Sequence, residues 1–316
     1  MKRFVVIVSL ILSAQWTSAQ NFYNTPSDAR VTAMGGVSMA VTGDAYATAA
    51  NPSAALFGRK TIQAAFGYTK FSGAPMRHNR MMSFGVYGRV ENRHLFAAGG
   101  NFGIEPLFEY SGKRPGVQRY EVAYGYKATE RFAFAVTARY ARTYGHYKGG
   151  CIISDFNAGG LDFSVTGQLP TKILDGAAVA TLGAKLTGCL GGSMPEYDIY
   201  VFGASVGGGL VMPFTDSHSL EIGADVKYGW AGDLGHMVYG GIGAEYTLMQ
   251  LLYFRIGGNI THYTDPYYML DYHTMGYGTI GVGVRFFHLQ FDVAYSAGRR
   301  NAPMSNMVQF SVGLDF

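Results

Sequence analysis

The chain has 316 residues, of which 44 are Gly, 23 are Tyr and 21 are Phe, and only 15% are charged. An average soluble domain carries about 25% charged residues, and a disordered chain is highly charged and poor in aromatic residues. The net charge of +4 is small and the basic residues are scattered, whereas a nucleic-acid-binding protein concentrates them on one face. Two cysteines argue against a disulfide scaffold. The composition therefore indicates a glycine-rich, aromatic-rich β protein.

Residues 1–19 are typical of a cleaved signal peptide. Met1-Lys2-Arg3 is positive, Phe4 to Leu12 is almost wholly apolar, and Thr17-Ser18-Ala19 supplies small residues before a cleavage site at Gln20. The apolar run is too short for a membrane-spanning helix, which needs about 20 residues. Because no other apolar run approaches that length, membrane insertion requires a closed β-barrel, in which every backbone group is paired.

Residues 61–316 alternate apolar with small or polar side chains, as strands with two different faces do. In the last segment, Val308, Phe310, Val312, Leu314 and Phe316 fall on one side and the polar residues on the other. We predict an all-β, antiparallel transmembrane barrel of about fourteen strands, an even number as in bacterial single-chain barrels. The expected strands are Thr61–Phe71, Met81–Val90, His94–Gly103, Val117–Tyr126, Phe132–Tyr140, Gly160–Leu169, Ala177–Thr187, Tyr200–Met212, Ser219–Trp230, Met237–Tyr246, Leu252–Thr261, Gly276–Phe286, His288–Ser296 and Asn306–Phe316.

The connections between these segments alternate in length. Short ones such as 91–93 and 247–250 alternate with longer ones such as 141–157 and 263–274. Outer-membrane barrels place short turns on the periplasmic side and longer loops outside.

The inward face of the predicted barrel carries charges of both signs that nearly cancel. A selective ion pore would show a ring of one sign, so these charges pair with each other, pair with a plug, or line a solvated wall. The many inward glycines leave room for a packed plug or for a ligand passage. The basic positions are Arg89, Lys127, Arg131, Arg139, Lys185, Lys227, Arg255 and Arg285, and the acidic ones are Glu121, Asp162, Glu221, Asp225, Glu245, Asp292 and Asp315.

Residues 20–60 do not alternate, and we expect them to fold into the lumen as a plug with short helices. Asp44 is a candidate N-cap for a helix over Ala45 to Ala50. Asn51 is a candidate N-cap for a second helix that starts at Pro52 and ends at Gly58. The expected organisation is a signal peptide (1–19), a plug (20–60) and a barrel (61–316).

Several short motifs in this segment resemble the N-terminal signature of the FadL/PorV superfamily of outer-membrane proteins. They are Asp28-Ala29-Arg30, Ala33-Met34-Gly35-Gly36, Asp44-Ala45 and Asn51-Pro52, and Ser53 stands where the family pattern has Ala. The resemblance implies a fourteen-stranded barrel with an N-terminal plug. Members of the FadL type resemble passive channels for long-chain fatty acids and other hydrophobic compounds. Members of the PorV and PorQ type are accessory proteins of type IX secretion in Bacteroidetes, and the Ala-Arg and Met-Gly steps are closer to that side.

No catalytic or metal-binding pattern stands out. His262, Asp265, Asp271 and His273 share one outer loop without a recognised ligand spacing, and no Ser/His/acid set emerges. Cys151 and Cys189 fall in neighbouring outer loops of an exported chain and are a candidate disulfide. The aromatic outer loop of Tyr263, Tyr267, Tyr268 and Tyr272 is either a membrane-interface anchor or a docking surface.

Together with the barrel pattern, the resemblance implies a non-catalytic accessory of type IX secretion or surface attachment, in the outer membrane of a Gram-negative bacterium. Its expected partners are outer-membrane lipid and secretion proteins or secreted cargo, with no cofactor and no nucleic acid. The alternative is a channel for hydrophobic compounds, whose partner is a hydrophobic small molecule, and an outer-membrane enzyme is a more distant third.

Overall fold

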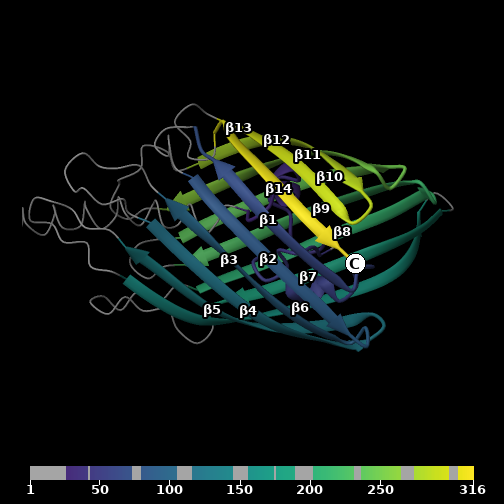
Figure 1. Cartoon of the computed structure of the whole chain (residues 1–316), viewed down its shortest axis with the longest axis horizontal. Helices are drawn as coiled ribbons and strands as arrows, with labels where there is room; N and C mark the ends of the chain where they lie inside the picture. Colours follow the sequence, from purple (N-terminus) through teal and green to yellow (C-terminus); the bar gives the residue numbers. More distant parts are fainter. Residues whose placement is uncertain are drawn as a thin grey trace, which may run out of the picture.

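The computed structural model describes residues 26–41, 43–72, 80–104, 116–144, 156–173, 176–188, 202–230, 236–264, 274–298 and 305–316. Within these ranges, fourteen strands form one closed antiparallel barrel in which each strand pairs with its sequence neighbours and β1 pairs with β14 (Figure 1). The strands are β1 (Ile62–Lys70), β2 (Arg80–Val90), β3 (His94–Ile104), β4 (Gly116–Thr129), β5 (Phe132–Tyr144), β6 (Phe156–Ile173), β7 (Gly176–Thr187), β8 (Phe202–Thr215), β9 (His218–Trp230), β10 (His236–Leu248), β11 (Leu252–Thr264), β12 (Thr274–Phe286), β13 (Leu289–Gly298) and β14 (Met307–Asp315).

The predicted all-β barrel is confirmed, and each expected segment coincides with one strand. Several strands extend beyond the alternating region, most clearly β6, which starts at Phe156 and ends at Ile173. At these extra residues the strands remain paired although apolar and polar side chains no longer alternate clearly. The alternation in the sequence therefore does not predict them.

The outer wall is apolar over its whole circumference. Ile242 and Ile256 are 67% and 64% exposed, and the outward positions of the last strand, such as Phe310 and Val312, are also exposed. Neighbouring positions on the same strands are buried and polar or small, for example Gln309 and Ser311. Such a surface would be an aggregation hazard in water but suits the hydrocarbon layer of a membrane.

The hydrogen-bonded ladder is continuous around the ring in the described residues. Register shifts occur at Lys127/Thr129 and at Pro213/Thr215. Both lie at the short-turn end of the barrel, and the second contains a proline, which lacks the N–H that a ladder needs. The described wall therefore has no break between its two ends.

The N-terminal segment lies inside the ring of strands, where it is drawn in purple (Figure 1). It contains two short helices, α2 (Ala29–Ala33) and α3 (Pro52–Ala55). The second begins where the sequence predicts it. The expected helix over 45–50 is wrong, because those residues form hydrogen-bonded turns, and α2 was not predicted. No helix in the described ranges is long and apolar enough to cross a membrane.

Candidate functional site: the interface between plug and wall

The plug backbone lies directly on a glycine surface of the wall. A Cβ atom added to Gly257 would lie 2.4 Å from the backbone of Met34, and one added to Gly243 would lie 2.2 Å from it. Gly35 has φ +69° and its own added Cβ would lie 2.6 Å from the carbonyl oxygens of Gly258 and Ile242. Glycine is therefore required on both sides of this contact. The inward glycines make room for the plug rather than for an open passage at this level.

Arg30, in α2, bridges two wall glutamates. Glu221 of β9 and Glu245 of β10 are directly opposite in the strand register. One guanidinium nitrogen of Arg30 lies 2.7 Å from Glu221 Oε2, and its Nε lies 2.8 Å from Glu245 Oε2. Burial opposes the charged form of Arg30, but the carboxylates of Glu245 and Glu221 raise its pKa, so it is a fixed cation. Like charges facing each other across a ladder are unfavourable, and Arg30 supplies the countercharge.

The network continues across the wall through Arg255. Its Nε lies 2.5 Å from Glu245 Oε2, and its Nη1 lies 2.5 Å from Asp292 Oδ1 on β13, two strands away. The guanidinium crosses β12 over Gly283, where an added Cβ would lie 2.2 Å from Asp292 Oδ1. A glycine at 283 is thus what allows the charge chain to pass from β11 to β13.

The segment after α2 is held by β9. Asp225 accepts hydrogen bonds from the backbone N–H groups of Ser38 (2.6 Å) and Met39 (3.0 Å). Lys227 donates to the carbonyl of Gly36 at 2.8 Å. These charge-assisted bonds to backbone groups satisfy polar atoms that would otherwise be buried without partners.

The second half of the plug is held by β6 and β7. Asn51 donates to the carbonyl of Met39 at 2.7 Å and to Thr166 Oγ1 of β6 at 2.9 Å, and Ser53 also contacts that oxygen at 2.7 Å. Lys185 of β7 points its ammonium at the carbonyls of residues 48, 49 and 50, at 3.2–3.4 Å. Asn51 is the N-cap residue of α3, as predicted, but its side chain makes no capping hydrogen bond and ties two plug segments to the wall instead.

Near the short turns, the plug packs against the wall through apolar side chains. Leu56 belongs to a buried cluster with Tyr87, Leu95 and several alanines of the wall. Phe57 packs against this cluster, and the ammonium of Lys127 lies 5.1 Å from the centre of its ring. The plug therefore contacts strands on opposite sides of the barrel.

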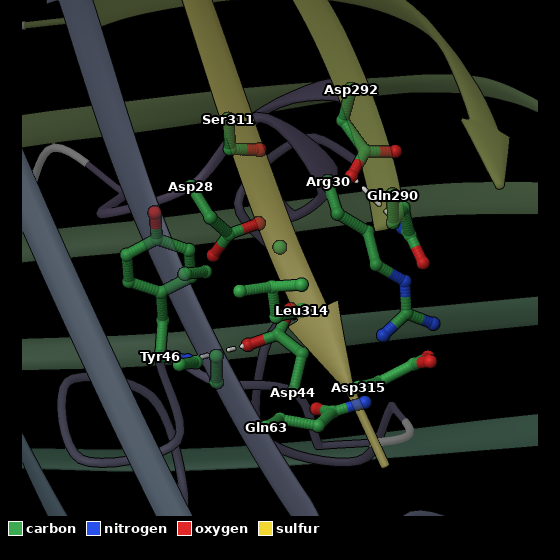
Figure 2. A pocket seen from close by; sticks show the side chains of 14 residues that line it. Asp28, Arg30, Asp44, Tyr46, Gln63, Gln290, Asp292, Ser311, Leu314 and Asp315 are labelled. Carbon is green, nitrogen blue, oxygen red and sulfur yellow. Dashed lines mark hydrogen bonds between the residues drawn. The ribbon is translucent and has the colours of Figure 1, made fainter. Parts of the chain in front are cut away.

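A small polar cavity of about 50 Å³ lies between the plug and the β1/β14 wall. Asp28, Asp44 and Asp292 line it together with Arg30 (Figure 2). Asp28 caps α2 by accepting from the N–H of Val31 at 2.6 Å. Burial and the neighbouring Asp44 carboxylate raise the pKa of Asp28, and burial likewise raises the pKa of Asp44. These two carboxylates lack the direct guanidinium contact that Asp292 has.

The other predicted lumen charges pair along the wall or with the plug. Arg139 and Lys185 both contact Asp162 at 3.3 Å, and Arg285 contacts Asp315 at 3.1 Å. Arg89 donates to the carbonyl of Lys60 at 2.8 Å. Glu121 pairs with Arg119, at 3.2 Å. Arg131 was placed wrongly, because it lies exposed in the turn between β4 and β5.

Part of the predicted site falls outside the described residues. Cys151, Cys189, Tyr267, Tyr268 and Tyr272 belong to this group. Tyr263 lies within β11, which continues to Thr264, rather than in the loop. The candidate disulfide stays a prediction. No group of three or more metal-binding side chains occurs within the described ranges.

Sequence reasoning placed Asp28 in the motif but missed its role as the N-cap of α2, and it missed Tyr239. An aspartate directly before Ala29-Arg30 is an N-cap signal that identifies α2. Tyr239 of β10 donates to the carbonyl of Gly35 and lies where a Cβ on Gly36 would sit. Nothing in the local sequence indicates that contact, because it depends on how the plug lies across the strands.

A closed ring of strands with an apolar exterior and a filled lumen defines an outer-membrane β-barrel with an N-terminal plug. A family model described as Type IX secretion system protein PorV matches residues 13–167, which include the plug and the first strands. Over these residues the chain is similar to the PorV family. No curated protein sequence matches the chain.

Solved structures of similar fold include two toluene transporters and a FadL homologue. The toluene transporter TodX of Pseudomonas putida is 16% identical with a TM-score of 0.57, and the match covers 90% of this chain and 96% of that chain. The toluene transporter TbuX of Ralstonia pickettii is 16% identical with a TM-score of 0.58, covering 93% and 99%. A FadL homologue of Pseudomonas aeruginosa is 12% identical with a TM-score of 0.59, covering 92% and 99%. At these identities the likeness shows the fold alone.

Proposed function

We propose that this barrel is a non-catalytic accessory of type IX secretion that holds secreted cargo or components of the secretion machinery at the outer membrane. The observation that supports it most directly is the Arg30 bridge to Glu221 and Glu245. Together with the backbone-to-glycine contacts of Gly35, it makes the plug an integral part of the barrel. A protein built this way acts through its surfaces while the barrel anchors it.

The alternative function, passage of hydrophobic compounds, finds little support in the described lumen. The cavity beside the plug is small and lined by Asp28, Asp44 and Asp292, which suits water and not a fatty acid. The described strands pair with their neighbours all the way around the ring, which leaves no break for a ligand to leave sideways.

The test is affinity purification of the tagged full-length chain from native membranes, with mass spectrometry of both proteins and lipids. We expect secretion-system proteins or exported cargo to be enriched over a control purification of an unrelated tagged outer-membrane barrel. Enrichment of one hydrophobic compound without secretion proteins would favour the channel. Recovery of neither would refute both functions.

We also propose export through a signal peptide cut before Gln20, into the outer membrane of a Gram-negative bacterium, with residues 20–60 as the plug. The intact mass of the purified mature chain tests the cleavage site. A chain that retains Met1 to Ala19 would refute it.

A further inference from the structure

The charged side chains of the described strands are divided by face. The carboxylates all point inward: Glu121, Asp162, Glu221, Asp225, Glu245, Asp292 and Asp315 are buried. Three charged side chains share the outward, lipid-facing side with apolar residues, and all three are basic: Lys70, Arg80 and Arg142. All three lie near the strand ends that lead into the longer loops, which in such barrels face the cell exterior. In the described strands, every charged residue on the lipid-facing side of this outer rim is therefore basic.

Two of these cations are direct neighbours. Lys70 of β1 and Arg80 of β2 are opposite each other in the strand register, and both are exposed. Like charges in this position destabilise a strand pair unless an anion lies between them. Neither residue forms an ion pair within the described ranges, and the sequence between them contains no Asp or Glu. The countercharge has to come from outside the strand pair.

An aromatic row places these cations at the level of the lipid headgroups. On the outward faces of β2 to β5, the ring centres of Phe84 and Phe102 are 6.0 Å apart, those of Phe102 and Tyr120 are 5.5 Å apart, and those of Tyr120 and Tyr140 are 6.5 Å apart. Aromatic girdles mark the membrane–water interface of such barrels. Arg80 and Arg142 lie on the outer side of this row, on the same strand faces as Phe84 and Tyr140.

We propose that Lys70 and Arg80 form a docking site for the phosphate group of an outer-leaflet lipid, with Arg142 as a further contact around the wall. A phosphate between the two cations replaces their repulsion with two charge-assisted contacts. The aliphatic stems lie along the apolar wall while the charged ends reach the headgroup. The site is independent of the proposed secretion role, because it rests on the lipid-facing wall alone.

The probe is diphosphorylated lipid A, added to the detergent-solubilised full-length chain and measured by native mass spectrometry. The double variant Lys70→Gln/Arg80→Gln is expected to bind it about tenfold to thirtyfold more weakly than the wild type, at roughly 1 kcal/mol per cation. The matched control is Arg131→Gln, which removes an exposed cation at the opposite end of the barrel and is expected to bind as the wild type does. The heat-induced shift in gel mobility confirms that each variant is folded.

Two further arms identify the chemical group and its source. Dephosphorylated lipid A is expected to bind the wild type and the double variant equally tightly. Millimolar inorganic phosphate is expected not to displace the lipid, because the acyl chains contribute to binding. Three results would each overturn the proposal. The double variant could bind diphosphorylated lipid A as tightly as the wild type does, dephosphorylated lipid A could still bind the wild type more tightly than the double variant, or inorganic phosphate could displace the lipid.

Discussion

Replacing Arg30 by Gln is the most direct test of how the plug is held. The substitution keeps the approximate length and polarity of the side chain but removes the positive charge between Glu221 and Glu245. Glu245 keeps its contact with Arg255 at 2.5 Å. Glu221 and Glu245 then face each other across the β9/β10 ladder without the guanidinium between them.

The size of the effect follows from the burial of the group. Arg30 is 9% exposed and its charge-assisted hydrogen bonds to Glu221 and Glu245 are 2.7, 2.8 and 3.2 Å long. Removing one partner of a buried ion pair costs about 3–5 kcal/mol. At 1.4 kcal/mol per factor of ten, the fraction of molecules with a detached plug should rise at least a hundredfold.

Hydrogen exchange reads this fraction directly. The backbone N–H groups of Ser38 and Met39 donate to Asp225 of the wall, so they exchange only when the plug leaves β9. We expect their exchange in Arg30→Gln to be at least a hundredfold faster than in the wild type. Arg93→Gln, in the exposed β2/β3 turn, is the matched control and should leave the rate unchanged.

A second substitution separates the loss of the attraction between Arg30 and the glutamates from the repulsion between Glu221 and Glu245. Adding Glu221→Gln to Arg30→Gln removes one of the facing carboxylates, so the double variant should exchange more slowly than Arg30→Gln alone. Exchange in Arg30→Gln within threefold of the wild type would refute the bridge as the main lock. If the amides of the double variant exchange as fast as those of Arg30→Gln, repulsion between Glu221 and Glu245 does not contribute.

Three further outcomes are expected. Gly35→Ala should loosen the plug by the same exchange measurement, since its Cβ would meet backbone at 2.6 Å, whereas Gly278→Ala, with nothing within 4 Å, should not. Lys185→Met should speed exchange of the 45–50 turns about tenfold, because three carbonyls lose their donor. The raised pKa values of Asp28 and Asp44 mean that the docked plug binds protons more tightly than the detached one. Their stabilising contribution is present below the ordinary aspartate pKa and is lost as pH rises through the raised values. Asp28→Asn, which keeps a capping side chain, should therefore dock more firmly than the wild type at neutral pH, and an unchanged difference between pH 5 and pH 8 would contradict this.

The wall was predictable because its two faces meet different surroundings. Lipid on one side and plug or water on the other impose a period of two on each strand, which the sequence records residue by residue. The inward glycines also indicated that the lumen leaves room for a plug or a ligand passage. What remained open was the identity of the occupant, which depends on the path of residues 26–60 through the lumen.

The plug was harder to predict for two physical reasons. Helices of four or five residues gain little from intrinsic propensity, so their positions are set by contacts with the wall. The partners of Arg30 are 191 and 215 residues away in the chain. They meet only because the ring closes with one particular register. A distant contact also decides the side chain of Asn51, because its amide donates to the buried carbonyl of Met39 and makes no hydrogen bond to the backbone of its own helix.

The motifs that signal the family act mainly as contacts between plug and wall. Arg30 neutralises a glutamate pair, Gly35 allows the backbone to touch the strands, and Asn51 joins two plug segments to β6. A plug attached at several points detaches only when all of these contacts break, so the loss of any one of them raises the detached fraction. The strand ring itself is shared with transporters of similar fold. The proposed secretion role therefore places recognition on the surfaces of the barrel, whereas the cation pair of Lys70 and Arg80 concerns the lipid-facing wall alone.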